Sequence, residues 1–90
     1  MILVDSVFIN NGGGLVLLKH LVDYLESEFQ DIFYLFDRRT EVYFKNIPVL
    51  RKKYISNSLM ERHVFYQANK MKFDQVLCFG NLPPTIRLNS

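Results

Sequence analysis

The apolar residues in the first third of the chain predict a strand followed by a helix. Residues 2–9, ILVDSVFI, form an apolar run interrupted by Asp5 and Ser6. This run predicts a buried strand, which either ends near Asp5 or continues with one polar pair facing a crevice. After a run of glycines, apolar residues recur at helical spacing at Leu15, Leu18, Val22, Leu25 and Phe29, with Leu17 and Leu21 widening the stripe. This periodicity predicts an amphipathic helix.

The middle of the chain predicts two more strands. Residues 31–39, DIFYLFDRR, are an aromatic and β-branched run that ends in charges, which is typical of a strand. Residues 41–46, EVYFKN, give a weaker signal for a third strand. Pro48 marks a boundary, and a short helical turn through Leu50 and Tyr54 is expected after it.

The last third predicts a second helix and a fourth strand. Ser58 and Glu61 have the spacing of a capping box, in which each side chain binds an otherwise unpaired backbone N–H. The helix behind them carries an apolar stripe that we expect to be buried in the core: Met60, Val64, Ala68 and Met71. Residues 76–79, VLCF, are apolar without alternation, which predicts a strand covered on both sides in a parallel sheet.

This order of elements predicts an α/β fold. We expect a Rossmann-like parallel sheet of about four strands with helices on both faces, because right-handed crossovers join parallel strands in this way. Ligands of such sheets bind outside the carboxyl ends of the strands. The turns at residues 12–14 and at Gly80 would both lie on that edge, which makes it the expected position of a site.

Composition limits the classes of protein. The 90 residues are 49% hydrophobic and 22% charged, as in an ordinary globular domain, and we expect a single partial domain over residues 1–90. The net charge of +2 does not favour a nucleic-acid partner. A single cysteine, Cys78, and the absence of a secretory signal pattern favour the cytoplasm. The apolar runs are far shorter than the roughly 20 residues of a membrane span.

The glycine run has a chemistry of its own. Gly12, Gly13 and Gly14 precede the predicted helix, where unshielded N–H groups and the helix dipole attract an anion. A tight turn that needs positive φ is the alternative explanation. We favour a phosphate site, because one glycine satisfies a turn whereas a run of glycines lets a ligand approach the backbone closely.

Two known phosphate-binding motifs fit the run poorly. A P-loop needs lysine and then serine or threonine after its last glycine, where this chain has Leu15 and Val16. In a dinucleotide fingerprint counted from Gly12, the last small residue is replaced by Leu17, whose bulk would obstruct packing of helix on strand. A nicotinamide-dependent reductase fragment or a stand-alone nucleotide-binding module nevertheless remains an alternative.

The charges after the second predicted strand keep the reductase alternative open. Asp37 stands where a dinucleotide-binding protein reads ribose, with Arg38 and Arg39 beside it. The simpler explanation, which we favour, is a solvated strand end.

The motifs together resemble a known family. An apolar first strand, NNGGG opening the helix LVLLKHLVDYL, and the later VLCFGNLPP are similar to the N-terminal domain of retaining glycosyltransferases of family 4. The resemblance extends from about Ile2 to Pro84. It implies one half of a GT-B enzyme of polysaccharide biosynthesis, a hexosyltransferase that moves a sugar from a nucleotide-sugar donor to a glycan or lipid-linked acceptor.

The resemblance also implies roles for individual residues. It places the donor diphosphate at Gly12, Gly13 and Gly14, and donor or acceptor contacts at Asn10, Asn11, Gly80, Asn81 and Pro83. Asp5 is a further candidate for acceptor contact, or alternatively a cap of the adjacent turn. The donor-binding C-terminal domain of the family is not within these residues, so we expect the chain to be inactive alone. No metal or cofactor beyond the nucleotide sugar is expected.

The remaining reactive or charged residues carry weaker predictions. Arg51, Lys52 and Lys53 are expected to form a solvated helix face, or to contact anionic lipid if the acceptor is lipid-linked. His20 and His63 lack the partners of a metal site, so we expect structural or solvated roles. Cys78 is expected to be a buried, unreactive thiol.

Overall fold

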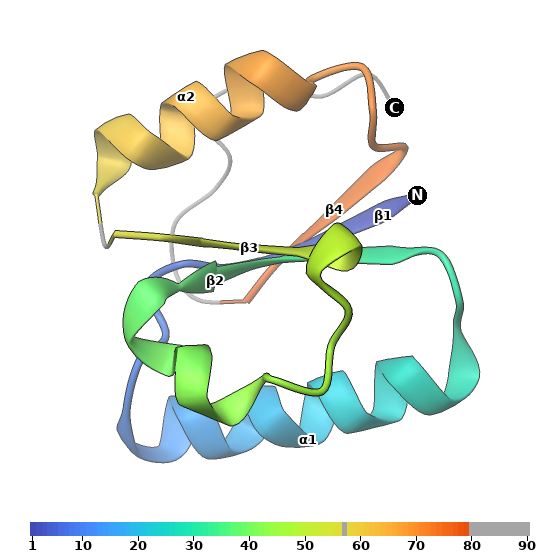
Figure 1. Cartoon of the computed structure of the whole chain (residues 1–90), viewed down its shortest axis with the longest axis vertical. Helices are drawn as coiled ribbons and strands as arrows, with labels where there is room; N and C mark the ends of the chain where they lie inside the picture. The colour runs from blue at the N-terminus through green and yellow to red at the C-terminus, as the bar shows by residue number, and fades with distance from the viewer. Residues whose placement is uncertain (57, 80–90) are drawn as a thin grey trace.

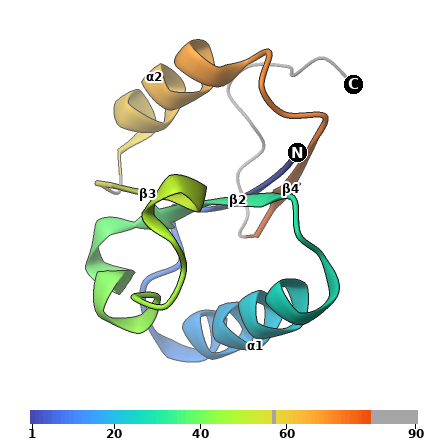
Figure 2. The same cartoon turned by 45° about the vertical axis from the view of Figure 1, so that its right-hand side comes forward.

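The computed structural model describes residues 1–56 and 58–79, and it confirms the predicted α/β class (Figure 1). Strands β1 (Ile2–Ser6), β2 (Ile32–Asp37), β3 (Lys52–Ile55) and β4 (Gln75–Cys78) form one parallel sheet in the order β3-β2-β1-β4. Helix α1 (Gly12–Glu28) covers one face of the sheet and α2 (Leu59–Asn69) the other, as Figures 1 and 2 show. Two short 3-10 segments, η1 (Arg38–Tyr43) and η2 (Val49–Arg51), connect β2 to β3.

The core has one layer on each face of the sheet. On the α1 side, Leu18 and Val22 pack with Val4 and Phe36 of the central strands. On the α2 side, the buried hydrophobic residues are Leu3, Val7, Phe33, Leu35, Ile55, Phe65, Tyr66 and Phe73. Every residue of β2 is buried, as expected for a strand covered on both faces. The predicted first helix and first two strands are therefore confirmed.

The predicted third strand is wrong in position. Residues 41–46 do not form a strand, because η1 already begins at Arg38. The carboxylate of Asp37 accepts from the backbone N–H of Arg39 at 2.9 Å, and the carbonyl of Asp37 accepts from the hydroxyl of Thr40 at 2.7 Å. These bonds turn the chain away from the sheet directly after β2.

The third strand of the sheet instead lies at Lys52–Ile55, where a helical turn through Tyr54 was expected. Tyr34 pairs with Lys52 and Asp37 with Ile55 in parallel register. The helical turn is confined to η2, which includes Leu50 but ends at Arg51.

The predicted core face of α2 is also wrong. Met60, Val64 and Met71 are 76%, 59% and 77% exposed, and Ala68 is exposed as well. The buried side chains of the helix are those of Arg62, Phe65 and Tyr66. The face that is turned inward is the one that carries Phe65, which stacks with Phe33 and Phe73 in the core. The Ser58 half of the predicted capping box is confirmed, since the Ser58 hydroxyl accepts from the N–H of Glu61 at 3.4 Å. The reciprocal half is wrong, because the N–H of Ser58 donates to the carbonyl of Ser56 at 2.7 Å and not to the Glu61 carboxylate.

Strand β4 is less covered than predicted. Its residues alternate between exposed and half-buried, with Gln75 and Leu77 exposed and Val76 and Cys78 half-buried. Within the described residues β4 pairs only with β1, so it forms an edge of this sheet. Val76 packs against the core layer beneath α2.

Candidate functional site at the carboxyl edge of the sheet

The glycine turn forms the start of α1. Gly12 has a φ of 67°, and the N-cap residue Asn11 is extended and makes no side-chain capping bond. The N–H of Leu15 donates to the carbonyl of Asn11 at 3.4 Å, which is the first bond along the helix. The glycine N–H groups lie before this bond and have no acceptor within the helix. The first turn also has no acidic residue. The positive end of this helix therefore has no compensating side chain of its own.

The glycines differ in what they require. Of Gly12, Gly13 and Gly14, only Gly12 has a positive φ, which disfavours any residue with a Cβ. Among the described residues, nothing lies within 4 Å of a Cβ placed on Gly13, and one placed on Gly14 would meet the side chain of Ile9 at 3.5 Å. Gly12 is therefore the one glycine that the turn itself needs. Gly13 is not needed for a positive φ or to avoid a clash of its side chain with the rest of the fold.

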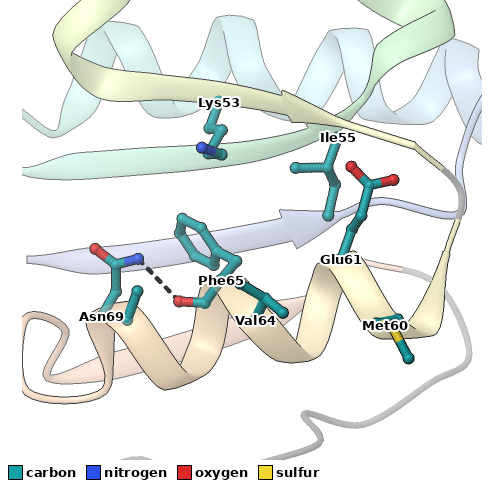
Figure 3. A pocket seen from close by; sticks show the side chains of 8 residues that line it. Lys53, Ile55, Met60, Glu61, Val64, Phe65 and Asn69 are labelled. Atoms are coloured by element: carbon teal, nitrogen blue, oxygen red, sulfur yellow. Dashed lines mark hydrogen bonds between the residues drawn. The ribbon is translucent and has the colours of Figure 1, made fainter.

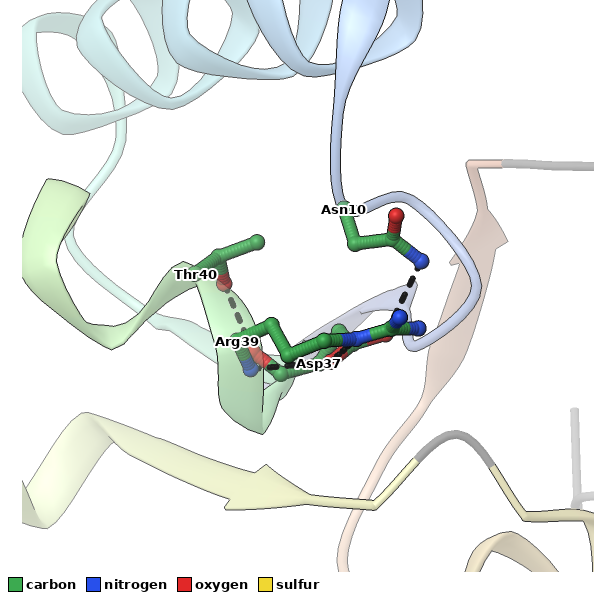
Figure 4. Close-up of polar contacts among 4 residues, drawn as sticks. All are labelled: Asn10, Asp37, Arg39 and Thr40. Carbon is green, nitrogen blue, oxygen red and sulfur yellow. Dashed lines mark hydrogen bonds and ion pairs between the residues drawn. The ribbon is translucent and has the colours of Figure 1, made fainter.

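A hydrogen bond links the loop before the glycines to the neighbouring strand. The side-chain amide of Asn10 donates to Asp37 Oδ2 at 3.2 Å (Figure 4). Asp37 is 1% exposed and ends β2, while residues 7–11 connect β1 to α1. Sequence reasoning missed this link, although Asp37 ends β2 and Asn10 follows the parallel strand β1, so that both lie at one edge of the sheet.

The carboxylate of Asp37 is fully engaged. Besides Asn10, it accepts from Arg39 through the backbone N–H at 2.9 Å, Nε at 3.3 Å and Nη2 at 3.1 Å. Burial alone would raise the pKa of Asp37, but the bonds from Arg39 and Asn10 outweigh burial, and the pKa is lowered. The predicted solvated strand end is wrong for this carboxylate and correct for the exposed side chains of Arg38 and Arg39.

Asp5 lies at the end of β1 and is buried on the α2 side. Its Oδ2 accepts from Arg62 Nε at 2.8 Å and from the Tyr66 hydroxyl at 2.5 Å. Its Oδ1 accepts from the N–H of Val7 at 3.3 Å, which is the turn-capping bond considered as one of its two possible roles. The contacts of Asp5 with Arg62 and Tyr66 were not foreseen from the sequence.

The groups around Asp5 keep their ordinary neutral-pH charge states. Burial opposes the charge of Arg62, but the negative Asp5 outweighs burial and raises the pKa of the guanidinium. Burial and Asp5 both raise the pKa of the Tyr66 hydroxyl. Burial also raises the pKa of Cys78, whose sulfur lies 3.9 Å from Arg62 Nη2, so the thiol remains protonated as predicted.

The basic run does not form a helix face. Arg51 pairs with Glu26 of α1 at 2.6 and 2.9 Å, and Lys52 Nζ donates to the carbonyl of Phe44 at 2.8 Å. Lys53 lies in β3 and is exposed. The expected solvated helix face is therefore wrong, and the lipid contact of this run stays a prediction.

A pocket of about 270 Å³ lies between β3 and α2 (Figure 3). Its lining is mostly apolar, with Ile55, Val64 and Phe65 among its residues, and its charged side chains are those of Lys53 and Glu61. A lining with one cation and one carboxylate does not favour an anion, so the glycine turn is the better candidate for a phosphate site.

The histidines are not part of a metal site in the described residues. His20 and His63 are exposed on α1 and α2. In residues 1–56 and 58–79, no group of His, Cys, Asp or Glu is arranged to hold a metal ion, and no helix there has the length and apolar character to cross a membrane. Gly80, Asn81 and Pro83, predicted to line the acceptor side, lie outside the described residues.

Comparison with known proteins yields no assignment: no family model, curated protein or solved structure matches this chain significantly. The fold itself defines a class, a Rossmann-like α/β protein with an open helix N-terminus at the carboxyl edge of its sheet.

Proposed function

We propose that this chain is the acceptor-side, N-terminal part of a retaining glycosyltransferase of the GT-B type. It would take part in moving a sugar from a nucleotide-sugar donor to a glycan or lipid-linked acceptor. The observation that carries the proposal is the uncapped start of α1, where Gly13 has neither a positive φ nor a crowded surrounding to require it. A ligand that must approach the backbone closely accounts for such a glycine.

The chemistry of sugar transfer fits this turn. When the donor sugar leaves, negative charge develops on its diphosphate, and fixed N–H donors stabilise that charge without reorganising. The N–H groups of Gly12, Gly13 and Gly14 would supply these donors. Asn11, whose side chain makes no capping bond, would be available to donor phosphate or acceptor sugar.

Asn10 has a different role in this proposal. Its amide NH₂ is bonded to Asp37, so it fixes the loop and offers a ligand only its remaining groups.

The reductase alternative is less well supported. An ionised carboxylate has about four acceptor positions, and the bonds from Arg39 and Asn10 occupy those of Asp37, so a ribose hydroxyl would have to displace one of them. The predicted obstruction of helix packing by Leu17, however, is wrong. Leu17 is 62% exposed, so its bulk does not lie between helix and sheet. Leu15 and Leu18 make that contact instead.

A titration of the 90-residue chain followed by amide NMR tests the proposal. Inorganic pyrophosphate is expected to shift the amide resonances of Gly12, Gly13 and Gly14, weakly, because the proposed donor domain is absent. NADPH that selectively shifted Asp37 and Arg38 would favour the reductase. Glycine resonances that do not respond to pyrophosphate would contradict the proposal. Turnover of a nucleotide sugar by this chain would contradict the expectation that the isolated chain is inactive.

A further inference from the structure

The buried cluster around Asp5 connects α2 to the loop that carries the glycine turn. We propose that Arg62 and Tyr66 are positioning residues for this turn, and that they act through the carboxylate of Asp5. This inference rests on the proposed function for the identity of the ligand. The coupling between α2 and the turn rests only on the contacts of the described residues.

One carboxylate oxygen of Asp5 binds side chains of α2, and the other binds the loop after β1. Oδ2 accepts from Arg62 and Tyr66 of α2, at 2.8 and 2.5 Å. Oδ1 accepts from the N–H of Val7, the residue that begins the turn after β1, at 3.3 Å. Since one planar carboxylate makes all three bonds, a rotation that lengthened the α2 bonds would also move the acceptor away from Val7.

The turn after β1 continues this constraint toward the glycines. The N–H of Ile9 donates to the carbonyl of Ser6 at 3.0 Å, which closes a tight turn. Ile9 packs against the cluster that contains Leu15 and Leu18 of α1, and a Cβ added to Gly14 would lie 3.5 Å from its side chain, so Ile9 joins the loop to the start of α1. The path from Asp5 to the glycine turn therefore consists of short contacts.

A second contact joins α2 to the same loop. The guanidinium carbon of Arg62 lies 5.6 Å from the ring centre of Phe8, within the range of a cation–π interaction. Arg62 is 1% exposed, so water does not compete for this charge. Arg62 thus contacts the loop directly as well as through Asp5.

Tyr66→Phe is the variant that tests this coupling, and Tyr34→Phe is its matched control. Both tyrosines are buried, and each hydroxyl donates to a carboxylate, since the Tyr34 hydroxyl lies 2.7 Å from Glu26 on the α1 side. Each substitution removes the hydroxyl and its bond to the carboxylate and leaves the ring, and Tyr66→Phe also removes the contact of the hydroxyl with the Cys78 thiol. Tyr66→Phe is expected to shift the amide resonances of Val7 and of residues 8–14 and to weaken pyrophosphate binding by about 3- to 10-fold. Tyr34→Phe is expected to leave both unchanged.

Phe8→Leu provides a second test, because it removes the ring that Arg62 contacts but leaves the Asp5 bonds in place. It is expected to shift the glycine amides in the same direction as Tyr66→Phe, by less. If neither variant changed the resonances of residues 8–14 more than Tyr34→Phe does, the coupling would be refuted. If Tyr66→Phe shifted them while the wild-type chain failed to bind pyrophosphate, the coupling would stand and the proposed function would fall.

Discussion

The side-chain amide of Asn10 lies 3.2 Å from the carboxylate of Asp37 and joins the loop after β1 to the end of β2. Asp37→Ala is expected to lower the free energy of unfolding by about 1.5–3 kcal/mol, because it removes an ionised acceptor shared by Asn10 and Arg39. Asn10→Ala, which removes one donor, is expected to cost about 0.5–1.5 kcal/mol. Urea denaturation measures both, with the exposed Asp23→Ala as control. A larger cost for Asn10→Ala than for Asp37→Ala would contradict this account.

The buried ion pair between Asp5 and Arg62 makes a second prediction. Arg62→Met is expected to lower the free energy of unfolding by about 3–5 kcal/mol, because it leaves the buried carboxylate of Asp5 without its cation. The double variant Asp5→Leu/Arg62→Met is expected to regain much of this loss, since no uncompensated charge remains. Chemical denaturation of the single and double variants provides the comparison, and a double variant no more stable than Arg62→Met would count against this explanation.

The pair between Glu26 and Arg51 predicts a dependence of stability on pH. Bonds from Arg51, and a weaker contribution from Tyr34, lower the pKa of Glu26 despite partial burial. The folded chain therefore holds the Glu26 proton less tightly than the unfolded chain does. The stabilisation is fully present above the unfolded pKa of about 4.3 and is lost as the pH falls through the lower folded value.

Unfolding of the wild type and of Glu26→Gln, measured from neutral pH to about pH 3, tests this dependence. The variant is expected to lose less stability over the acid range, because it has no carboxylate at this position. Parallel curves for the two proteins would show that the pair contributes nothing to the acid dependence.

The orientation of α2 predicts opposite outcomes for two neighbouring residues. Val64 is exposed and Phe65 stacks with Phe33 in the core. Val64→Ala is expected to change the free energy of unfolding by less than about 0.5 kcal/mol. Phe65→Ala is expected to cost about 3–5 kcal/mol through the cavity it leaves. Thermal or urea unfolding measures both variants. If Met60 and Val64 faced the core instead, Val64→Ala would cost more free energy of unfolding than Phe65→Ala.

The sequence predicted those elements whose signal is local. The helical spacing of Leu15, Leu18 and Val22 and the apolar run of β2 were sufficient to place α1 and the first two strands. The third strand was misplaced because Lys52 and Lys53 carry no apolar pattern. This strand exists through its pairing with β2, which is not local in the sequence.

Two buried charged residues, Arg62 and Asp37, explain why the core face of α2 and the contacts at the end of β2 were not predicted. Arg62 is typical of an exposed helix position, and the residue that accommodates it inside, Asp5, is 57 positions away. Sequence reasoning therefore assigned the wrong face of α2 to the core. For the candidate site, the glycine run was sufficient to identify the start of α1, but the engagement of Asp37 by Asn10 and Arg39 depends on two strands that meet only in the fold.

The central claim is that the glycines allow a diphosphate to approach the backbone, and Gly13→Ala tests it most directly. Gly13 has no positive φ, and a Cβ there meets no described atom within 4 Å apart from its chain neighbours and the nearby helix backbone, so alanine is expected to raise the free energy of unfolding by about 0.4–1 kcal/mol. Gly12→Ala, at a φ of 67°, is the contrasting variant and is expected to lower it by about 1–2 kcal/mol.

The decisive measurement is the pyrophosphate affinity of Gly13→Ala beside its stability. The account predicts a more stable protein that binds pyrophosphate at least about 10-fold more weakly, because the added methyl group obstructs the approach of the ligand. A Gly13→Ala protein that is more stable and binds pyrophosphate as tightly as the wild type would contradict it.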